Sequence, residues 1–193
     1  MRKLYSLVLI LLSFSCSEMY IVPETHYLIE EGEHKSKVVG GFFGDKLRTL
    51  KRDQFSFTAR FDETAVYDLN SNNQHDINKL MGFADANSMH QDNSIRFGWC
   101  YNLTTRKVDI FGYAYLDGER FYQRITDIDI GETGQFRIDL TDEAYELTVN
   151  DENKLIVPRK VKNKRGIYYL LFPYFGGNEV APHDINIFIK ERM

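Results

Sequence analysis

The stretch SIRFGWCYNLTTRKVDIFGYAYLDGERFYQRI, residues 94–125, decides the fold. Large apolar side chains occupy every second position from Ile95 to Tyr101, a period typical of a β-strand with one buried face. Asp117-Gly118 is a strong signal for a two-residue hairpin turn, and residues 102–107 suit a longer one. The stretch therefore predicts three consecutive antiparallel strands joined by two hairpins.

The two turns fix the expected register of these strands. Around Asp117-Gly118 we expect the pairs Leu116–Glu119, Tyr115–Arg120, Ala114–Phe121, Tyr113–Tyr122, Phe111–Arg124 and Ile110–Ile125. Across the longer hairpin we expect Tyr101–Val108, Trp99–Ile110, Phe97–Gly112 and Ile95–Ala114, where bulky residues meet small ones. Because side chains alternate along a strand, the three strands acquire two different faces.

The two predicted faces differ in chemistry. The first is apolar and predicts a core; its members are Ile95, Phe97, Trp99, Tyr101, Val108, Ile110, Gly112, Ala114, Phe121 and Ile125, with Gln123 as the strongly polar exception. The second combines aromatic rings with arginines; its members are Arg96, Gly98, Cys100, Asp109, Phe111, Tyr113, Tyr115, Arg120, Tyr122 and Arg124. The second set, named here the Arg/Tyr face, is neither a plain core nor a plain solvated surface.

The rest of the chain repeats the alternating pattern. It recurs in residues 55–61, 136–140, 145–149 and 185–189, and no sustained helical period appears. The 193 residues are 43% hydrophobic and 14% aromatic, which excludes a disordered chain and fits one globular domain. We therefore predict an all-β protein, a single antiparallel β-sandwich of roughly ten to twelve strands.

The N-terminus has the pattern of an export signal. Arg2 and Lys3 precede an apolar run of residues 4–12, which is shorter than the ~20 residues that span a bilayer. The run and the Ser15-Cys16 pair resemble a bacterial lipoprotein signal, which implies removal of residues 1–15 and lipidation of Cys16. Residues 16–193 would then form the single domain, anchored by lipid to a bacterial membrane on the periplasmic side or the cell surface. Secretion without a lipid is the alternative.

Net charge and cysteine content limit the classes of ligand and the chemistry expected of this chain. The formal net charge is −4, and loss of Arg2 and Lys3 with the signal leaves −6, so no basic excess favours nucleic acid. The second cysteine of the chain, Cys100, has no neighbouring histidine motif, and we expect it to be a small buried side chain.

Three further segments suggest a family. Residues 131–138 form a turn that leads into an alternating strand, residues 144–151 form the next strand, and residues 184–190 form a closing one. Together with residues 94–125 they resemble the concanavalin-A-like and laminin-G-like sandwiches, a jelly-roll fold. The resemblance implies that a glycan is bound or cleaved on the concave face. It also implies a structural calcium ion, for which Asp184 is the nearest match, while no other cofactor is expected.

The Arg/Tyr face is the predicted ligand site. Tyrosine rings offer flat apolar surfaces to sugars, and arginines offer paired donors to carboxylate or sulfate. The candidate ligand-binding residues are Arg96, Asp109, Tyr113, Tyr115, Arg120, Tyr122 and Arg124. We thus expect an envelope-anchored glycan-binding lipoprotein whose polysaccharide partner could be acidic, with catalysis left open. A packed face in which arginines pair with tyrosines or with Asp109 is the structural alternative.

Three other functions stay open. A polysaccharide lyase could be built from Arg96 or Arg124, Tyr113 or Tyr122, Gln123 and one of His75, His90 and His183. A glycoside hydrolase could use Asp127, Asp129 and Glu132, which nearly match the carboxylate strand of laminarinase-type enzymes. A structural or adhesive surface lipoprotein would need none of these groups.

Overall fold

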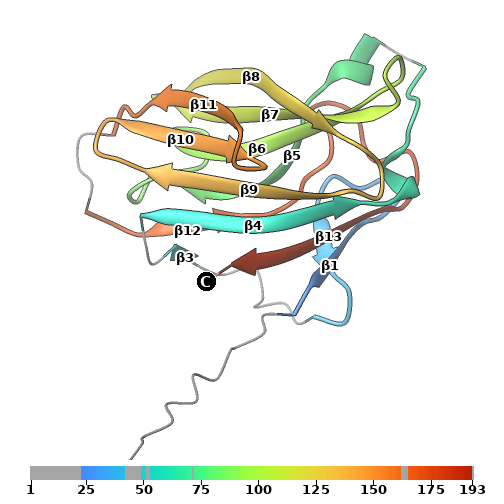
Figure 1. Ribbon diagram of the computed structural model, residues 1–193, viewed down its shortest axis with the longest axis horizontal. Helices are drawn as coiled ribbons and strands as arrows, with labels where there is room; N and C mark the ends of the chain where they lie inside the picture. Colours follow the sequence, from blue (N-terminus) through green and yellow to red (C-terminus); the bar gives the residue numbers. More distant parts are fainter. Residues whose placement is uncertain (1–22, 42–48, 51–52, 71, 162–164, 193) are drawn as a thin grey trace, which may run out of the picture.

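The computed structural model describes residues 23–41, 49–50, 53–70, 72–161 and 165–192 (Figure 1). Cys16 and the predicted signal of residues 1–15 lie outside the described residues, so lipidation stays a prediction. No helix in the described part of the chain has the length and apolar character needed to cross a bilayer.

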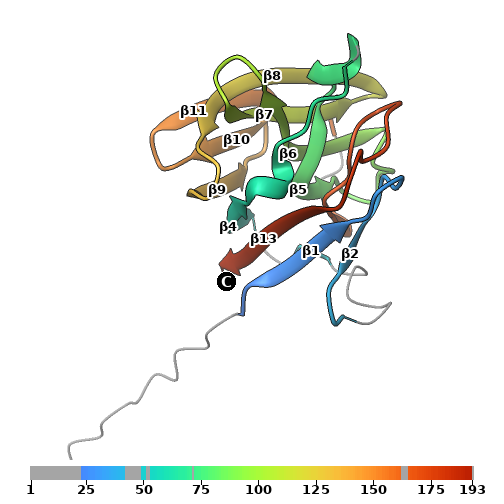
Figure 2. The ribbon, with the colours of Figure 1, turned by 90° about the vertical axis from the view of Figure 1, so that its right-hand side faces the viewer.

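The described chain folds into two antiparallel sheets that face each other (Figures 1 and 2). The first sheet has the order β11 (Asn153–Pro158), β10 (Ala144–Val149), β9 (Thr133–Leu140), β4 (Gln54–Phe61), β13 (Ile185–Arg192), β1 (Thr25–Ile29) and β2 (Ser36–Val38). The second has the order β3 (Thr49–Leu50), β12 (Tyr168–Leu171), β5 (Asn78–Ala84), β6 (Asn93–Asn102), β7 (Lys107–Leu116) and β8 (Glu119–Ile128). Two short 3₁₀ turns, η2 (Glu63–Ala65) and η3 (Asn72–His75), lie between β4 and β5. The predicted all-β sandwich is confirmed, with thirteen strands in the described residues where roughly ten to twelve were expected.

The core lies between the sheets and is rich in aromatic rings. Phe57 of β4 stacks on Phe136 of β9 with ring centres 5.1 Å apart, and Phe97 of β6 meets Phe136 edge-on at 5.0 Å. Trp99 is fully buried against Phe61, 4.9 Å away. Burying each such side chain contributes roughly 1.5–3 kcal/mol. The apolar face predicted for the hairpins is therefore the part of the second sheet that packs on the first.

The predicted register is correct except at one end. All four expected β6–β7 pairs are present, and β7 pairs with β8 as expected from Leu116–Glu119 to Phe111–Arg124. The expected Ile110–Ile125 pair is wrong, because Ile110 pairs with Thr126. A β-bulge inserts one extra residue there, a feature that alternation alone does not reveal. As a result Asp127 pairs with Asp109, on the same face as Arg124.

A buried ion pair ties the two sheets together at one end. Asp85 directly follows β5, and Arg159 directly follows β11. Arg159 donates from Nε to Asp85 Oδ2 and from Nη2 to Asp85 Oδ1, each at 2.7 Å. Tyr145 of β10 donates its hydroxyl to the same carboxylate. Side-chain exposure is 2% for Arg159 and 0% for Asp85, so this network fixes the ends of both sheets in a dry environment.

Candidate functional site

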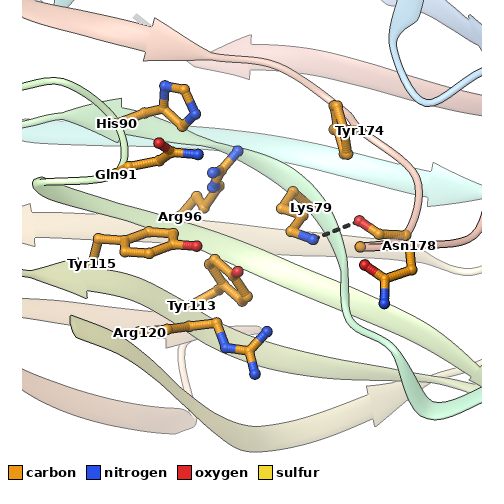
Figure 3. Close-up of a pocket in the computed structure, with 11 residues that line it drawn as sticks. Lys79, His90, Gln91, Arg96, Tyr113, Tyr115, Arg120, Tyr174 and Asn178 are labelled. Carbon is orange, nitrogen blue, oxygen red and sulfur yellow. Dashed lines mark hydrogen bonds between the residues drawn. The ribbon is translucent and has the colours of Figure 1, made fainter. Parts of the chain in front are cut away.

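A pocket of about 280 Å³ lies on the Arg/Tyr face, on the side of the second sheet that points away from the core. Strands β5 to β8 supply its floor, and the β5–β6 and β12–β13 loops supply its walls (Figure 3). Its lining residues are Lys79, His90, Gln91, Arg96, Tyr113, Tyr115, Arg120, Tyr174, Gly176, Gly177 and Asn178. Three of these carry a positive charge, and none is Asp or Glu.

A bulge in β5 brings Lys79 onto this face. Lys79 pairs with Gly98 and Gly82 pairs with Arg96, so two residues of β5 stand opposite Phe97 alone. Without the bulge, residues 79 and 82 would point to opposite faces; with it, both lie on the face of Arg96. A Cβ on Gly82 would come within 2.1 Å of the Ile95 carbonyl oxygen and 2.4 Å of Arg96 Cα, so only glycine permits this close approach.

The two inner cations of the pocket are buried without a carboxylate partner. Arg96 is 7% exposed, its Nε has no hydrogen-bond partner, and its guanidinium carbon lies 5.5 Å from the centre of the Tyr113 ring. Lys79 is 8% exposed, donates from Nζ to the Gly176 carbonyl oxygen at 2.6 Å, and lies 5.1 Å from the same ring centre. Among the described residues, neither cation forms a salt bridge. Burying charges in this way is costly unless an anion accompanies them.

Burial also sets the protonation states in the pocket. Burial and the neighbouring Arg96 charge lower the pKa of Lys79 to about 8, against an opposing attraction from the Asp76 carboxylate, and the amine stays largely protonated at neutral pH. Burial and the Arg96 charge also lower the pKa of His90, so the neutral imidazole dominates at pH 7. Burial and a hydrogen bond with Tyr115 raise the pKa of Tyr113 to about 12, which keeps this phenol protonated. The pocket thus combines buried cations with neutral donors and one neutral base.

A smaller depression of about 60 Å³ adjoins the pocket. Lys79, Tyr113, Arg120 and Gly177 line both, so the two hollows form one groove across β5, β7 and β8. The smaller hollow is completed by His75, Asp76, Ile77 and Tyr122. Tyr122 is 52% exposed, and the Arg120 guanidinium lies 5.5 Å from the centre of its ring.

The structure divides the predicted ligand-binding residues into two groups. Arg96, Tyr113, Tyr115 and Arg120 meet in the larger pocket, and Tyr122 lines the smaller one.

Asp109 and Arg124 line neither hollow. Arg124 donates from Nε to Asp109 Oδ1 at 2.8 Å and from Nη2 to Asp127 Oδ2 at 2.5 Å. The bulge in β8 explains this arrangement, because it turns Asp127 onto the face of Arg124. Arg124 is therefore neutralised by two carboxylates, in contrast to Arg96.

Lys79 and the wall residue Asn178 were not among the sequence candidates. Lys79 could not be predicted from the sequence, because β5 is buried along its whole length and shows no alternation that would mark a ligand-facing lysine. The bulge after Lys79 also changes the face on which this side chain lies. Asn178 follows Gly176-Gly177, which predicts a turn. A turn signal does not indicate which strand the following residue will pack against.

Of the remaining lyase and hydrolase candidates, two line the groove and the others lie elsewhere. His75 and His90 line the groove, whereas Gln123 and His183 do not, and His183 contacts the Thr64 carbonyl oxygen at 2.9 Å. Asp127 and Asp129 lie 3.4 and 3.2 Å from Lys107 Nζ, and Glu132 accepts a hydrogen bond from the Asp129 backbone N–H. These carboxylates line neither hollow of the groove.

Asp184 and Cys100 stand apart from the groove. Asp184 Oδ1 accepts a hydrogen bond from the Glu31 backbone N–H at 2.9 Å. In the described part of the chain, no three His, Cys, Asp or Glu side chains converge as a set of metal ligands, so calcium at Asp184 stays a prediction. Cys100 is a free thiol that is 2% exposed, and burial raises its pKa to about 12, which agrees with the expected buried side chain.

Comparisons with known proteins identify the fold. No protein-family model matches the chain, and no curated protein matches its sequence. Alginate lyase AlyC3 superposes with a TM-score of 0.55 at 10% identity, over 86% of this chain and 73% of the lyase. A family 16 endo-glucanase from Bacteroides ovatus gives a TM-score of 0.52 at 12% identity, over 89% and 80%. A third match, from work on endo-acting O-glycanases of the human gut microbiota that initiate mucin breakdown, gives 0.55 at 8% identity, over 87% and 76%. At such identities the likeness establishes the fold alone: the chain is a concanavalin-A-like jelly-roll sandwich.

Proposed function

We propose that the protein binds an acidic glycan in the groove, with a carboxylate or sulfate of the sugar placed between Arg96 and Lys79. One observation carries the proposal: both cations are more than nine-tenths buried, neither forms a salt bridge with the described residues, and no carboxylate lines the larger pocket that they share. An anion bound there would complete the ion pairs that the protein leaves open. A guanidinium can engage a carboxylate through two parallel hydrogen bonds, a stronger contact than a single neutral one.

The tyrosines of the groove suit a sugar ring. Tyr113 and Tyr115 meet edge-on with ring centres 6.0 Å apart on the floor, and Tyr122 exposes about half of its surface beyond them. Each offers an apolar ring for the C–H faces of a sugar and a hydroxyl for its polar groups. The structural neighbours named as alginate lyase and endo-glucanase act on polysaccharides, which supports a glycan at the level of fold.

The N-terminal sequence supports a proposal about where the protein is located. We propose that Cys16 carries a lipid and holds the sandwich at the bacterial envelope. Metabolic labelling with a fatty acid, compared between the full chain and its Cys16→Ala variant, tests this part separately. Label that persists in the variant contradicts the anchor and leaves glycan binding untouched.

Calorimetric titration tests the binding. Oligosaccharides of a uronic acid and matched neutral oligosaccharides are titrated into the protein at pH 7. We expect heat only from the acidic set, and a loss of at least tenfold in affinity in Arg96→Met, because tenfold corresponds to about 1.4 kcal/mol and charged hydrogen bonds are worth about 1.5–3. Arg124→Met is the matched control, since Arg124 lies on the same sheet face but is satisfied by Asp109 and Asp127. Equal binding of neutral sugars, or equal losses in both variants, contradicts the proposal.

Cleavage of the same ligand by β-elimination is the second candidate. It is favoured by the protonation states, since a neutral His90 can accept a proton and a protonated Tyr113 can donate one. His90 would take the proton from the carbon that bears the carboxylate, and Arg96 would stabilise the enolate. The carbon–oxygen bond to the next sugar would break, a carbon–carbon double bond would form, and Tyr113 would protonate the leaving oxygen.

The two candidates give different products. Elimination produces an unsaturated sugar that absorbs ultraviolet light, and both His90→Ala and Tyr113→Phe would abolish it. A flat absorbance trace together with tight binding identifies a binder, in which His90 serves only as part of the pocket wall.

A further inference from the structure

The smaller hollow of the groove differs in charge from the larger pocket. It contains the carboxylate of Asp76, which is half-buried and forms no salt bridge or side-chain hydrogen bond with the described residues. A Cβ placed on Gly177 would lie 3.2 Å from Asp76 Oδ2, so this oxygen lies beside a residue that lines both hollows. A carboxylate that attracts the Lys79 ammonium therefore lies beside the passage between the two hollows.

The two hollows favour different sugars. Arg96 and Lys79 in the larger pocket attract a negatively charged group of the ligand. In the smaller hollow, Asp76 can accept hydrogen bonds from hydroxyl or amide N–H groups, whereas a second carboxylate would face a like charge. Lys79 and Arg120 line this hollow as well, and the Asp76 carboxylate offsets part of their positive charge there, whereas no carboxylate lines the larger pocket.

Tyr122 adds an apolar surface to the same hollow. About half of its side chain is exposed, on the strand next to Tyr113, with which it pairs across the sheet. An uncharged sugar can lie against this ring while its hydroxyl or N-acetyl groups reach Asp76. The chemistry of the smaller hollow is thus that of a neutral sugar with hydrogen-bond donors.

We propose that the groove selects a glycan in which an acidic residue is followed by an uncharged one, over a polymer that is charged at every residue. The proposal rests on the proposed function, since it assigns the acidic residue to the pocket of Arg96 and Lys79. Asp76 is the specificity-determining residue, because it disfavours a second carboxylate in the adjacent position.

Competition between defined hexasaccharides tests the selection at pH 7. The probes are a hyaluronan hexamer, which alternates uronate with N-acetylhexosamine, and hexamers of polygalacturonate and polymannuronate, which are charged throughout. Two homopolymers are used so that sugar stereochemistry is not mistaken for charge. Mass spectrometry after each titration verifies that the hexamers remain intact.

We expect the wild-type protein to bind the alternating hexamer about tenfold more tightly than either homopolymer, a factor that equals about 1.4 kcal/mol. Asp76→Asn should bring the ratio close to one, mainly by tightening the homopolymers, while Asp76→Glu should largely preserve it. Glu146→Gln is the matched control, because it removes the same charge from an exposed position on β10 of the other sheet.

The outcomes separate the two proposals. Preference for a homopolymer in the wild-type protein, or a ratio that is the same in wild type and Asp76→Asn, overturns the selection and leaves acidic-glycan binding intact. Absence of binding to all three hexamers overturns the proposed function and the selection together.

Discussion

The guanidinium of Arg96 lies 5.5 Å from the centre of the Tyr113 ring, and within the described structure this ring is its neighbour in place of a carboxylate. A cation–π contact offsets only part of the cost of burying the charge. The position is therefore unfavourable for the free protein and favourable for an anionic ligand.

Arg96→Met should raise the stability of the free protein while it weakens ligand binding. Methionine has a similar length and removes a buried charge, so we expect the free energy of unfolding to rise by about 1 kcal/mol. Urea unfolding without ligand measures the gain, and calorimetry with acidic oligosaccharide measures the loss. A lower free energy of unfolding in the variant would mean that Arg96 stabilises the free protein, which contradicts the view that its burial is unfavourable without a ligand.

Binding should weaken as pH rises above about 8. Lys79 has its pKa lowered by burial and by the Arg96 charge to about 8, so it loses its positive charge between pH 7 and pH 9.5, while Tyr113, with a pKa of about 12, stays protonated. A bound anion favours the charged amine and moves the decline upward in pH. Titrations across this range should show the decline in the wild type and its absence in Lys79→Met, whose affinity is lower throughout.

The same lysine should alter the pH dependence of stability. In the unfolded chain its pKa is near the ordinary value of 10.5, so between pH 8 and 10.5 the unfolded state binds more protons than the folded state. The contribution of Lys79 to the free energy of unfolding therefore rises with pH in this window, since the cost of burying the charge disappears. The difference in stability between wild type and Lys79→Met, measured by urea unfolding, should shrink from pH 7 to pH 10.5.

Gly82→Ala should damage the site from within the sheet. The added methyl group would overlap with the Ile95 carbonyl and the Arg96 backbone, and neither can move without breaking the β5–β6 ladder. We expect a loss of about 1–3 kcal/mol in stability, the usual cost of overpacking, together with weaker glycan binding. Gly118→Ala is a useful comparison, because a Cβ there meets nothing within 4 Å and only its φ of +83° opposes the change. Unaltered binding in Gly82→Ala would show that the close approach of β5 and β6 at Gly82 does not position Arg96.

Asp85→Asn should destabilise the sandwich without direct contact with the groove. The change leaves the Arg159 guanidinium buried with no charged partner, for which we expect a loss of about 3–5 kcal/mol. Thermal unfolding measures the effect, and Asp151→Asn, which loosens an exposed pair with Arg137, should cost about 0–1 kcal/mol. Similar losses in both variants would contradict the importance assigned to the buried network.

The sequence predicted those parts of the structure in which strict alternation continues. Alternation from Ile95 to Tyr101 and the Asp117-Gly118 turn sufficed for the register of three strands and for the separation of core from Arg/Tyr face. Two strand predictions failed: the Ile110–Ile125 pair was wrong, and Lys79 was not recognised as a pocket residue. Both failures come from bulges, because a single extra residue reverses the face on which the following side chains lie.

The contents of the pocket were less predictable than its floor. Four of the expected residues meet there because they share one face of adjacent strands. Asn178 and Gly176 arrive from a loop far along the chain, and a loop gives no periodic signal of where it will pack. The sequence also could not predict that Arg124 pairs with carboxylates while Arg96 does not. Tertiary contacts alone determine which arginine lies beside a carboxylate.

The charge contrast between pocket and protein has a kinetic consequence. The chain as a whole carries a net charge of −4, while the pocket lining is cationic, so an acidic glycan is repelled at long range and attracted only on contact. Salt screens the long-range repulsion far more than it screens buried charges, because the Debye length is about 10 Å at 0.1 M salt. Added salt would therefore speed association yet hardly change dissociation, the reverse of what a basic polyanion-binding surface shows.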